Sequence, residues 1–241
     1  MSYKEKITSK DNVNFKHYKK LLVKKYRDKT GEFLVHGRHL VEEAMKVPGL
    51  LQTILTIDSN EEGILLTHEL IRMLSSSGAK YDIIGVCKRL DNQFVLPTSN
   101  NILVLDGIQD PTNLDALLRS ALAFGYNQVY ISNDSADIFH EKTIRASQGA
   151  LFNLEINRKD LVDIFEELNE NNYKIIATDL SGEKAEVINF KKKALILGNE
   201  GAGISQLSKK NANILVTIPM NKKVESLNVS VAGGILMYLL R

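Results

Sequence analysis

The chain has 241 residues, 44% of them hydrophobic and 25% charged, and a formal net charge of +2. These values are typical of a globular protein and exclude a disordered one, and no run approaches the roughly 20 apolar residues that a membrane-spanning helix needs. The first ten residues lack the apolar core of a secretory signal, and the single cysteine, Cys87, excludes an intrachain disulfide or a multi-cysteine zinc site. We expect a cytoplasmic protein with no membrane partner and, because its five histidines form no complete ligand set, no metal.

Positive charge is concentrated at the N-terminus. Residues 1–30 carry ten Lys or Arg against three Asp or Glu, a net charge of +7 that leaves −5 for the rest of the chain. Such a block favours a polyanion, because each neutralised phosphate releases condensed counterions, although a solvated surface helix is the plainer alternative. The candidate RNA-binding side chains are Lys16, Lys19, Lys20, Lys24, Lys25 and Arg27.

Residues 1–97 are predicted to form a small α/β domain. Its N-terminal helix, 12–29, has apolar positions along one face and ends at Gly31. Further helices are expected at 38–46 and 61–75, and strands at 33–35, 51–57, 81–86 and 94–96. Pro97-Thr98-Ser99-Asn100 indicates a linker after this domain.

A second α/β domain is predicted at residues 101–241. Strands at 102–105, 128–132, 174–178, 194–197 and 214–218 alternate with helices at 114–124, 140–147, 160–171 and 226–240. This alternation predicts a mostly parallel sheet with both faces covered. In such sheets ligands gather at the carboxyl ends of strands, and the polar clusters of this domain follow strands.

The first polar cluster is Asp110-Pro111-Thr112-Asn113, at the start of a helix that carries Arg119. Asn113 is either an ordinary N-cap or a site residue. Arg119 lies among leucines and alanines, so it either extends from an apolar face to pair with an acid or binds a phosphate at the rim of a pocket.

The second cluster is Gly198-Asn199-Glu200-Gly201-Ala202-Gly203, directly after a strand. Glycines allow a backbone to approach a ligand closely, but the spacing is not that of dinucleotide folds, and the Gly-Lys-Ser/Thr of a nucleotide-triphosphate loop is missing. An unrelated nucleotide-binding enzyme is therefore a weak alternative. Glu200 has little to pack against among glycines, which favours a functional carboxylate.

The third cluster is IPMNKKVESLNVSVAGGILMYLLR, residues 218–241. A basic loop leads into a helix for which Ser226 is the predicted N-cap and Asn228 a residue of the first turn, where backbone donors face outward. Gly233 and Gly234 each cost about 1 kcal/mol in a helix, so their presence predicts close approach of another helix or chain. An ordinary packing helix is the alternative.

Together these segments resemble the SpoU/TrmH family of RNA ribose 2′-O-methyltransferases, part of the SPOUT class. The three ordered motifs are DPTNLDALLRSALAFG, LGNEGAGIS and IPMNKKVESLNVSVAGGILMYLL, at residues 110–125, 197–205 and 218–240. IRASQGALF, residues 144–152, also fits the family pattern. KYRDKTGEFLVHGRHLVEEAM, residues 25–45, is similar to the family's small RNA-binding domain, more weakly.

The resemblance implies a trefoil knot in the C-terminal domain, S-adenosylmethionine (AdoMet) as the methyl donor, and a homodimer with sites near its interface. The catalytic residues that it implies are Asn113, Arg119, Glu200, Ser226 and Asn228. The donor-binding residues that it implies are Thr178, Leu197, Gly198, Glu200, Gly201, Ile218, Met220, Leu227 and Asn228.

Two positions depart from the family pattern. Asp115 stands where the family usually has glycine, and we expect its carboxylate to lie near the RNA phosphates and repel them, so that Asp115→Gly raises activity or RNA affinity. His36 stands where the small domain often has glutamate. The resemblance predicts methylation of a ribose 2′-hydroxyl, with large-subunit ribosomal RNA favoured over transfer RNA. A non-catalytic RNA-binding member of the same fold is the other alternative.

Overall fold

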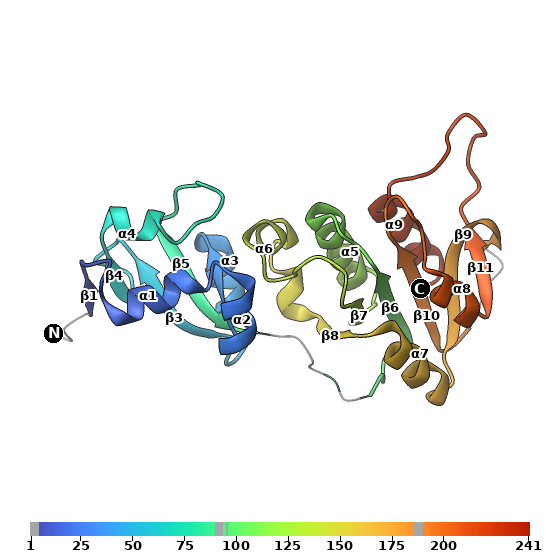
Figure 1. The fold of residues 1–241 in the computed structure, drawn as a ribbon, viewed down its shortest axis with the longest axis horizontal. Coiled ribbons are helices and arrows are strands. Elements are labelled where there is room, and N and C mark those ends of the chain that lie inside the picture. Colours follow the sequence, from blue (N-terminus) through green and yellow to red (C-terminus); the bar gives the residue numbers. More distant parts are fainter. Residues whose placement is uncertain (1–4, 90–93, 95, 186–189) are drawn as a thin grey trace. The chain divides into compact units, whose positions relative to one another are not determined.

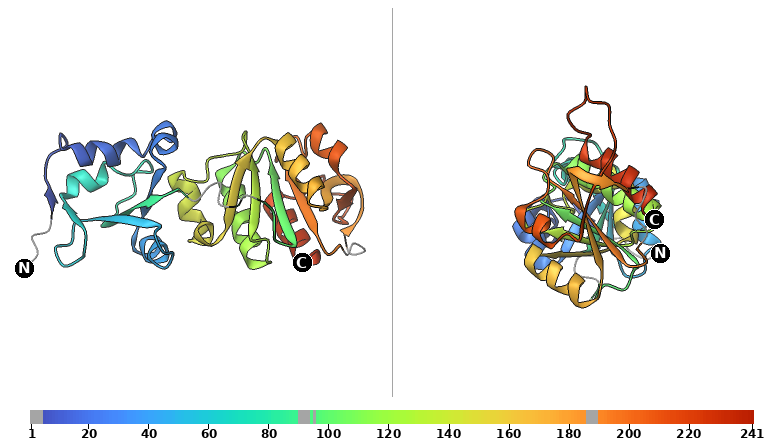
Figure 2. Two further views of the ribbon diagram at one scale, coloured as in Figure 1. Left: turned by 90° about the horizontal axis from the view of Figure 1, so that it is seen from below. Right: turned by 90° about the vertical axis from the view of Figure 1, so that its right-hand side faces the viewer.

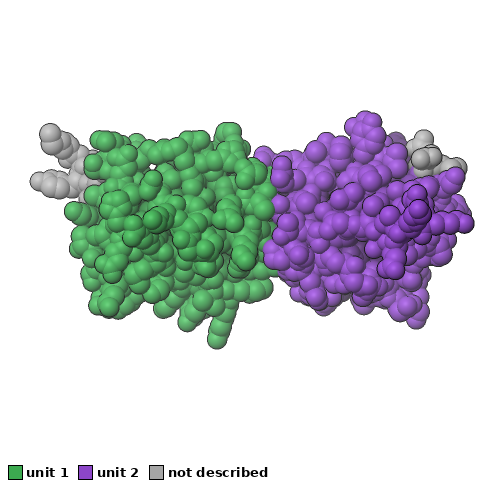
Figure 3. Space-filling model, turned by 90° about the horizontal axis from the view of Figure 1, so that it is seen from above, with its two compact units in different colours: residues 1–90, 137–152 green, residues 91–136, 153–241 purple. Residues whose placement is uncertain are grey.

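The computed structural model describes residues 5–89, 94, 96–185 and 190–241. The chain divides into two compact units, one of Met1–Leu90 with Asp137–Phe152, the other of Asp91–Ala136 with Asn153–Arg241 (Figure 3). The prediction placed residues 137–152 in the second domain, whereas their contacts group them with the first unit. In the described part of the chain, no helix combines the length and apolar character required to cross a membrane.

The first unit is built on a mixed sheet, with strand order β1-β4-β3-β5-β2 among the residues described (Figure 1). The strands are β1 (Lys6–Ile7), β2 (Glu32–His36), β3 (Leu51–Thr56), β4 (Ile64–Leu66) and β5 (Ile83–Lys88). The helices are α1 (Val13–Lys20), α2 (Lys24–Thr30), α3 (Arg38–Met45), α4 (His68–Arg72) and α6 (Glu141–Ser147). A core that includes Phe15, Leu34 and Leu55 fills the space between sheet and helices, and Cys87 is buried as expected of a small hydrophobe.

Three predicted elements of this unit differ in the structure. The helix predicted at 12–29 is two helices, because the chain turns at Leu21–Val23. The helix predicted at 61–75 is β4 followed by the short α4, capped by the Thr67 hydroxyl. Phe94 and Leu96 lie outside any strand, and Val95, the middle of the predicted strand 94–96, lies outside the described residues.

The structure corrects the prediction that Arg27 contacts RNA. Its side chain is only 5% exposed, and its guanidinium donates to Asp137 Oδ2 at 2.5 Å and to the Leu21 carbonyl at 2.7 Å. A buried, paired guanidinium has no surface to offer a phosphate. The five lysines of the same prediction are exposed along α1 and α2: Lys16, Lys19, Lys20, Lys24 and Lys25.

Segment 137–152 joins the first unit through one carboxylate as well as through aromatic packing. Phe33 on β2 stacks against Phe139, with ring centroids 4.6 Å apart. The carboxylate of Glu141, on α6, accepts hydrogen bonds from the three hydroxyls of residues 75–77, from two of their backbone amides and from the Tyr81 hydroxyl. Burial alone raises the pKa of Glu141, but the hydroxyls of Ser77 and Ser76 outweigh it and lower that pKa to about 2.

We expect Glu141→Gln to lower the free energy of unfolding by about 2 kcal/mol at pH 7, because an amide cannot accept the same set of donors. The folded pKa lies below the unfolded value of 4.5, so the carboxylate stabilises the fold above about pH 4.5. That contribution is lost as the pH falls towards 2. Urea unfolding at pH 7 and pH 3 measures the difference, with the exposed Glu69→Gln as control. Equal stability of the two variants at pH 7 would contradict the prediction.

The second unit is built on a parallel sheet of strand order β11-β9-β10-β6-β7-β8 in the region described (Figure 1). The strands are β6 (Asn101–Asp106), β7 (Gln128–Ser132), β8 (Glu155–Lys159), β9 (Lys174–Lys184), β10 (Lys193–Gly198) and β11 (Ile214–Thr217). All five pairings between them are parallel. The predicted α/β class is therefore confirmed, while the knot stays a prediction. The strand β8, with the polar sequence EINRK, was not predicted.

Helices cover both faces of this sheet, as expected for buried parallel strands. Figures 1 and 2 show α5 (Pro111–Ala123) and α9 (Val229–Leu239) on one face and α7 (Leu161–Glu170) and α8 (Gln206–Asn211) on the other. The core between sheet and helices includes Ile102, Tyr130 and Ile196. Helix α8, with the polar sequence QLSKKN, was not predicted.

The predicted close approach at the glycine pair of α9 is confirmed at one of its two positions. A Cβ on Gly233 would lie 2.4 Å from Leu117 Cδ2 and 2.6 Å from Leu197 Cδ1, so α9 packs closely on α5 and β10 here and a larger residue would have to displace two leucine side chains. A Cβ on Gly234 would meet only Ser120 Oγ, at the ordinary distance of 3.5 Å.

Candidate active site

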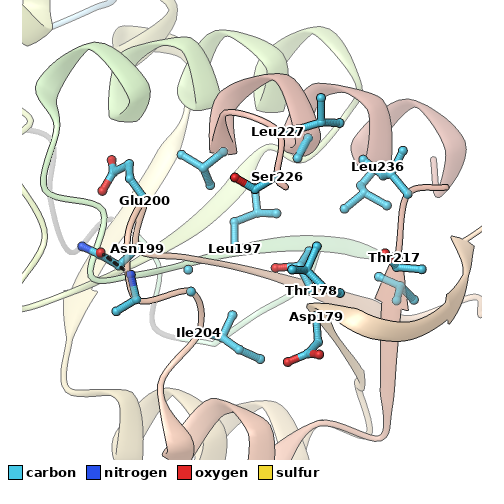
Figure 4. Close-up of a pocket in the computed structure, with 18 of the residues that line it drawn as sticks. Thr178, Asp179, Leu197, Asn199, Glu200, Ile204, Thr217, Ser226, Leu227 and Leu236 are labelled. Carbon is cyan, nitrogen blue, oxygen red and sulfur yellow. Dashed lines mark hydrogen bonds between the residues drawn. The ribbon is translucent and has the colours of Figure 1, made fainter. Parts of the chain in front are cut away.

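A cavity of about 360 Å³ opens where β9, β10 and β11 meet the start of α9 (Figure 4). Its apolar walls include Leu197, Ile204, Val216 and Leu236. The volume falls in the range of sites for small molecules and cofactors, which are mostly apolar with a few fixed polar groups.

Most of the predicted donor-binding residues line this cavity: Thr178, Leu197, Gly198, Glu200, Gly201, Ile218, Met220 and Leu227. Asn228 does not line it, although both of its neighbours do. Of the predicted catalytic residues, Glu200 and Ser226 line the cavity, and the close-up shows Glu200 at its edge and Ser226 among the other lining residues (Figure 4). Two of the three sequence motifs, 197–205 and 218–240, therefore line one cavity, whereas the first, 110–125, supplies none of the lining residues.

Asn113, Glu200 and Asn228 form a chain of hydrogen bonds beside the cavity. The Asn113 amide nitrogen donates to Glu200 Oε1 at 3.0 Å, and the Asn228 amide nitrogen donates to Asn113 Oδ1 at 2.9 Å. Glu200 Oε1 also accepts from the backbone amide of Asp110 at 3.2 Å. One residue from each motif is thus fixed by another, which holds the site in a single arrangement.

The caps of α5 and α9 explain why the side chains of Asn113 and Asn228 are available for these hydrogen bonds. Asp110 is the N-cap of α5, accepting from the amides of Thr112 and Asn113, so the Asn113 side chain is free of capping. Asn228, not the predicted Ser226, caps α9: its Oδ1 accepts from the amides of Ser230 and Val231. Its amide nitrogen is left to reach Asn113.

The glycine loop after β10 closes tightly on itself. Asn199 and Gly203 exchange backbone hydrogen bonds of 2.9 and 3.0 Å, and Asn199 Oδ1 accepts from the amides of Gly201 and Ala202. A Cβ on Gly198 would lie 2.3 Å from the Gly203 carbonyl carbon. Gly198 is therefore required so that two parts of the loop backbone can pass close to each other. From the sequence, only close approach of a glycine backbone to a ligand was expected.

Arg119 lies on α5 with an exposed side chain and does not line the cavity. The structure therefore places its guanidinium outside the Asn113–Glu200–Asn228 network, at the surface where a large substrate can reach it. This placement fits phosphate binding better than the predicted alternative of a salt bridge within the protein.

Asp115 is buried, contrary to the expectation of a carboxylate exposed to RNA. The residue is 4% exposed, and its Oδ1 has no hydrogen-bond partner among the described residues. Burial raises the pKa of Asp115 to about 6, against the lowering influence of the Arg119 charge. A buried acid without a partner destabilises the folded state once it ionises.

We expect Asp115→Asn to raise the free energy of unfolding by about 1–2 kcal/mol at pH 8 and to change it little at pH 4. The folded pKa lies above the unfolded value of 3.8, so the wild-type carboxyl is harmless below about pH 4, and its cost appears as the pH rises towards 6. Urea titrations at both pH values measure this. A benefit that is the same at pH 4 and pH 8 would contradict ionisation as its cause.

Two charged residues of the cavity wall, Asp179 and Lys209, were not predicted. Asp179 directly follows the predicted residue Thr178, whereas Lys209 lies on the unpredicted helix α8. Within the described ranges, no three His, Cys, Asp or Glu residues are grouped as a metal site would require. His36 is buried on β2, where its ring bonds the Leu74 carbonyl at 2.8 Å, and burial lowers its pKa.

Comparison with known proteins identifies the class of protein to which this parallel sheet and its site belong. Residues 100–238 match the SpoU rRNA methylase family, and residues 12–90 match the MRM3-like substrate binding domain. The chain belongs to the SpoU rRNA methylase family, and the family predicted from the sequence is confirmed.

The names of individual relatives are more specific than the name of the family. The chain is 35% identical to the 23S rRNA (guanosine(2553)-2′-O)-methyltransferase RlmP of Bacillus subtilis, over 98% of this chain and 99% of that one. It is 34% identical to the 23S rRNA (guanosine-2′-O-)-methyltransferase RlmB of Coxiella burnetii, over 83% of this chain and 79% of the other. The solved structure of an AdoMet-bound rRNA methyltransferase from Sinorhizobium meliloti matches with a TM-score of 0.87 at 25% identity, covering 98% of this chain and 96% of that one.

Proposed function

We propose that the protein transfers a methyl group from AdoMet to a ribose 2′-hydroxyl of 23S ribosomal RNA, at a guanosine. The observation that carries this proposal is a cavity lined by residues of two family motifs, 197–205 and 218–240, beside which Asn113 of the first motif is hydrogen-bonded to both Glu200 and Asn228. The similarity to RlmP extends over nearly the whole chain, so it supports the same substrate class for both units.

The cavity fits AdoMet in three respects. Leu227 and Leu236 offer an apolar surface for adenine. The tight loop that begins at Gly198 brings backbone groups to the cavity wall. Glu200 supplies a carboxylate for a donor that carries positive charge. When bound, AdoMet supplies the electrophilic methyl group.

The residues of the chain orient the ribose and stabilise the negative charge that develops on its oxygen. A ribose hydroxyl must lose its proton in or near the transition state to act as a nucleophile. Arginine, with a pKa above about 12, stays charged in proteins, so we assign Arg119 to the RNA phosphate and to the alkoxide charge that develops. Asn113, held by Glu200 and Asn228, and Ser226 at the cavity border position the sugar.

The first unit binds the RNA in this proposal. Five exposed lysines lie along α1 and α2, in the region that matches a substrate binding domain. Neutralisation of phosphates by lysines makes binding weaken steeply as salt concentration rises. Affinity for RNA that does not change between about 50 and 200 mM salt would argue against this assignment.

A homodimer is part of the same proposal. Helix α9 exposes four apolar side chains at i, i+4, i+7 and i+8, each 37% exposed or more: Val231, Ile235, Tyr238 and Leu239. The opposite face of α9 is buried, so these residues form one stripe on a helix that also carries the site residue Asn228. A second copy of the chain supplies a matching apolar stripe. Sedimentation velocity should give twice the mass of one chain, and a monomer at micromolar concentration would contradict this.

The test of function is methyl transfer from labelled AdoMet to 23S rRNA transcribed in vitro, with transfer RNA as the comparison. Ribose methylation blocks alkaline cleavage at the modified nucleotide, which locates the product and identifies its base. Label in transfer RNA alone would favour the alternative substrate. RNA binding without transfer to either would favour the non-catalytic alternative.

A cytoplasmic location completes the proposal, since ribosomal RNA is the substrate.

A further inference from the structure

The wall of the cavity carries an ion pair that neither the sequence motifs nor the proposed chemistry explain. Lys209 Nζ on α8 lies 2.6 Å from Asp179 Oδ2 on β9, and both residues line the cavity. The Lys209 side chain is 39% exposed and that of Asp179 17%. An anion and a cation therefore stand side by side at one place in a site that is otherwise mostly apolar.

Asp179 is fixed independently of its lysine partner. Its Oδ1 accepts from the Ser181 amide at 2.9 Å and from the Ser181 hydroxyl at 2.7 Å. The hydrogen bonds from Lys209 and Ser181 hold the pKa of Asp179 well below its usual range, so it is ionised at any physiological pH. A partly exposed ion pair contributes little to stability, too little to explain two charges in a binding cavity.

The three substituents of the AdoMet sulfonium differ in chemistry, and so do the walls of the cavity. The substituents are a methyl group, an adenosyl group, and a chain that ends in an ammonium and a carboxylate. Figure 4 shows Glu200 on one side of the cavity, Leu236 and Thr217 on another, and Asp179 on a third. The first side adjoins the Asn113–Glu200–Asn228 network and the second is largely apolar, which leaves the third for the charged chain.

We propose that Asp179 and Lys209 form the subsite for the amino-acid end of the donor, with Asp179 binding its ammonium and Lys209 its carboxylate. This rests on the proposed function of the cavity. The two protein charges pair with each other in the free protein and exchange that partner for the two charges of the ligand. Opposite charges matched in this way give charge-assisted hydrogen bonds, the strong kind in proteins.

The test compares AdoMet with 5′-methylthioadenosine, which has the adenosyl and methyl groups but lacks the amino-acid end. Titration calorimetry on the full chain measures the Kd of each ligand for wild type, Asp179→Asn and Lys209→Met. Lys210→Met is the matched control, since Lys210 is the next residue of α8, is exposed and does not line the cavity. Retained binding of 5′-methylthioadenosine shows that each variant is folded.

We expect both variants to weaken AdoMet binding by roughly tenfold or more and 5′-methylthioadenosine binding by less than about twofold. Lys210→Met should match wild type for both ligands. Variants that lose both ligands equally, or neither, overturn the subsite while leaving the cavity as a donor site. A wild-type chain that binds neither ligand overturns the proposed function and the subsite with it.

Discussion

Replacing Arg119 by alanine is expected to lower the rate of RNA methylation by roughly 10²–10³-fold, the usual effect of removing one donor that stabilises charge in the transition state. The Kd for AdoMet should change by less than about twofold, because Arg119 lies outside the cavity. The network of Asn113, Glu200 and Asn228 does not involve Arg119, so the site should keep its shape.

Single-turnover methylation and calorimetry measure the two quantities separately. Arg119→Lys is the control for charge: it keeps a cation but loses the planar fork that binds two phosphate oxygens at once. We expect the methylation rate of Arg119→Lys to lie between those of Arg119→Ala and wild type. Methylation at the wild-type rate by Arg119→Ala would remove Arg119 from the reaction.

Gly198→Ala is expected to abolish donor binding, with a rise in Kd of about 100-fold or more. The new Cβ would stand 2.3 Å from both the Gly203 carbonyl carbon and the Ile204 amide nitrogen. These are backbone atoms, which cannot turn aside as a flexible side chain can, so the loop after β10 must open. The displaced residues include Glu200, and with it the contact to Asn113.

The matched control is Gly201→Ala, in the same loop. A Cβ there would approach only Asn199 Oδ1, at 3.7 Å, so this variant should keep the wild-type melting temperature. Gly198→Ala should melt several degrees lower, as expected for a strain of about 1–3 kcal/mol. Thermal unfolding by circular dichroism and AdoMet titration give both values. Wild-type affinity in Gly198→Ala would show that the loop tolerates the methyl group.

Local sequence patterns predicted the elements that carry the site. The apolar runs that became β6, β10 and β11, and the motif residues that follow them, were recognised because buried parallel strands and capped helices leave clear signals. The elements that were missed, β8 and α8, have the polar sequences EINRK and QLSKKN. Tertiary contacts, not their own periodicity, decide their structure.

The misassigned side chains depend on partners far away in the sequence. Arg27 was predicted to lie at the surface and contact RNA, but it pairs with Asp137, which lies 110 residues later in the chain. Asp115 was expected at the surface because its place in the helix does not reveal what covers it. Lys209 reaches the cavity from a helix that no motif includes. Spacing along the chain carries no information about such pairs.

The membership of Asp137–Phe152 in the first unit has a consequence for biosynthesis. As the nascent polypeptide leaves the ribosome, β6, α5 and β7 emerge before Phe139 and Glu141 do. Until then the Phe33 ring and the amides of Ser76 and Ser77 lack the partners that they have in the finished protein. During translation, domains commonly fold one after another from the N-terminus. The two units of this chain cannot follow that order strictly. The first unit can be completed only after part of the sheet of the second unit has been synthesised.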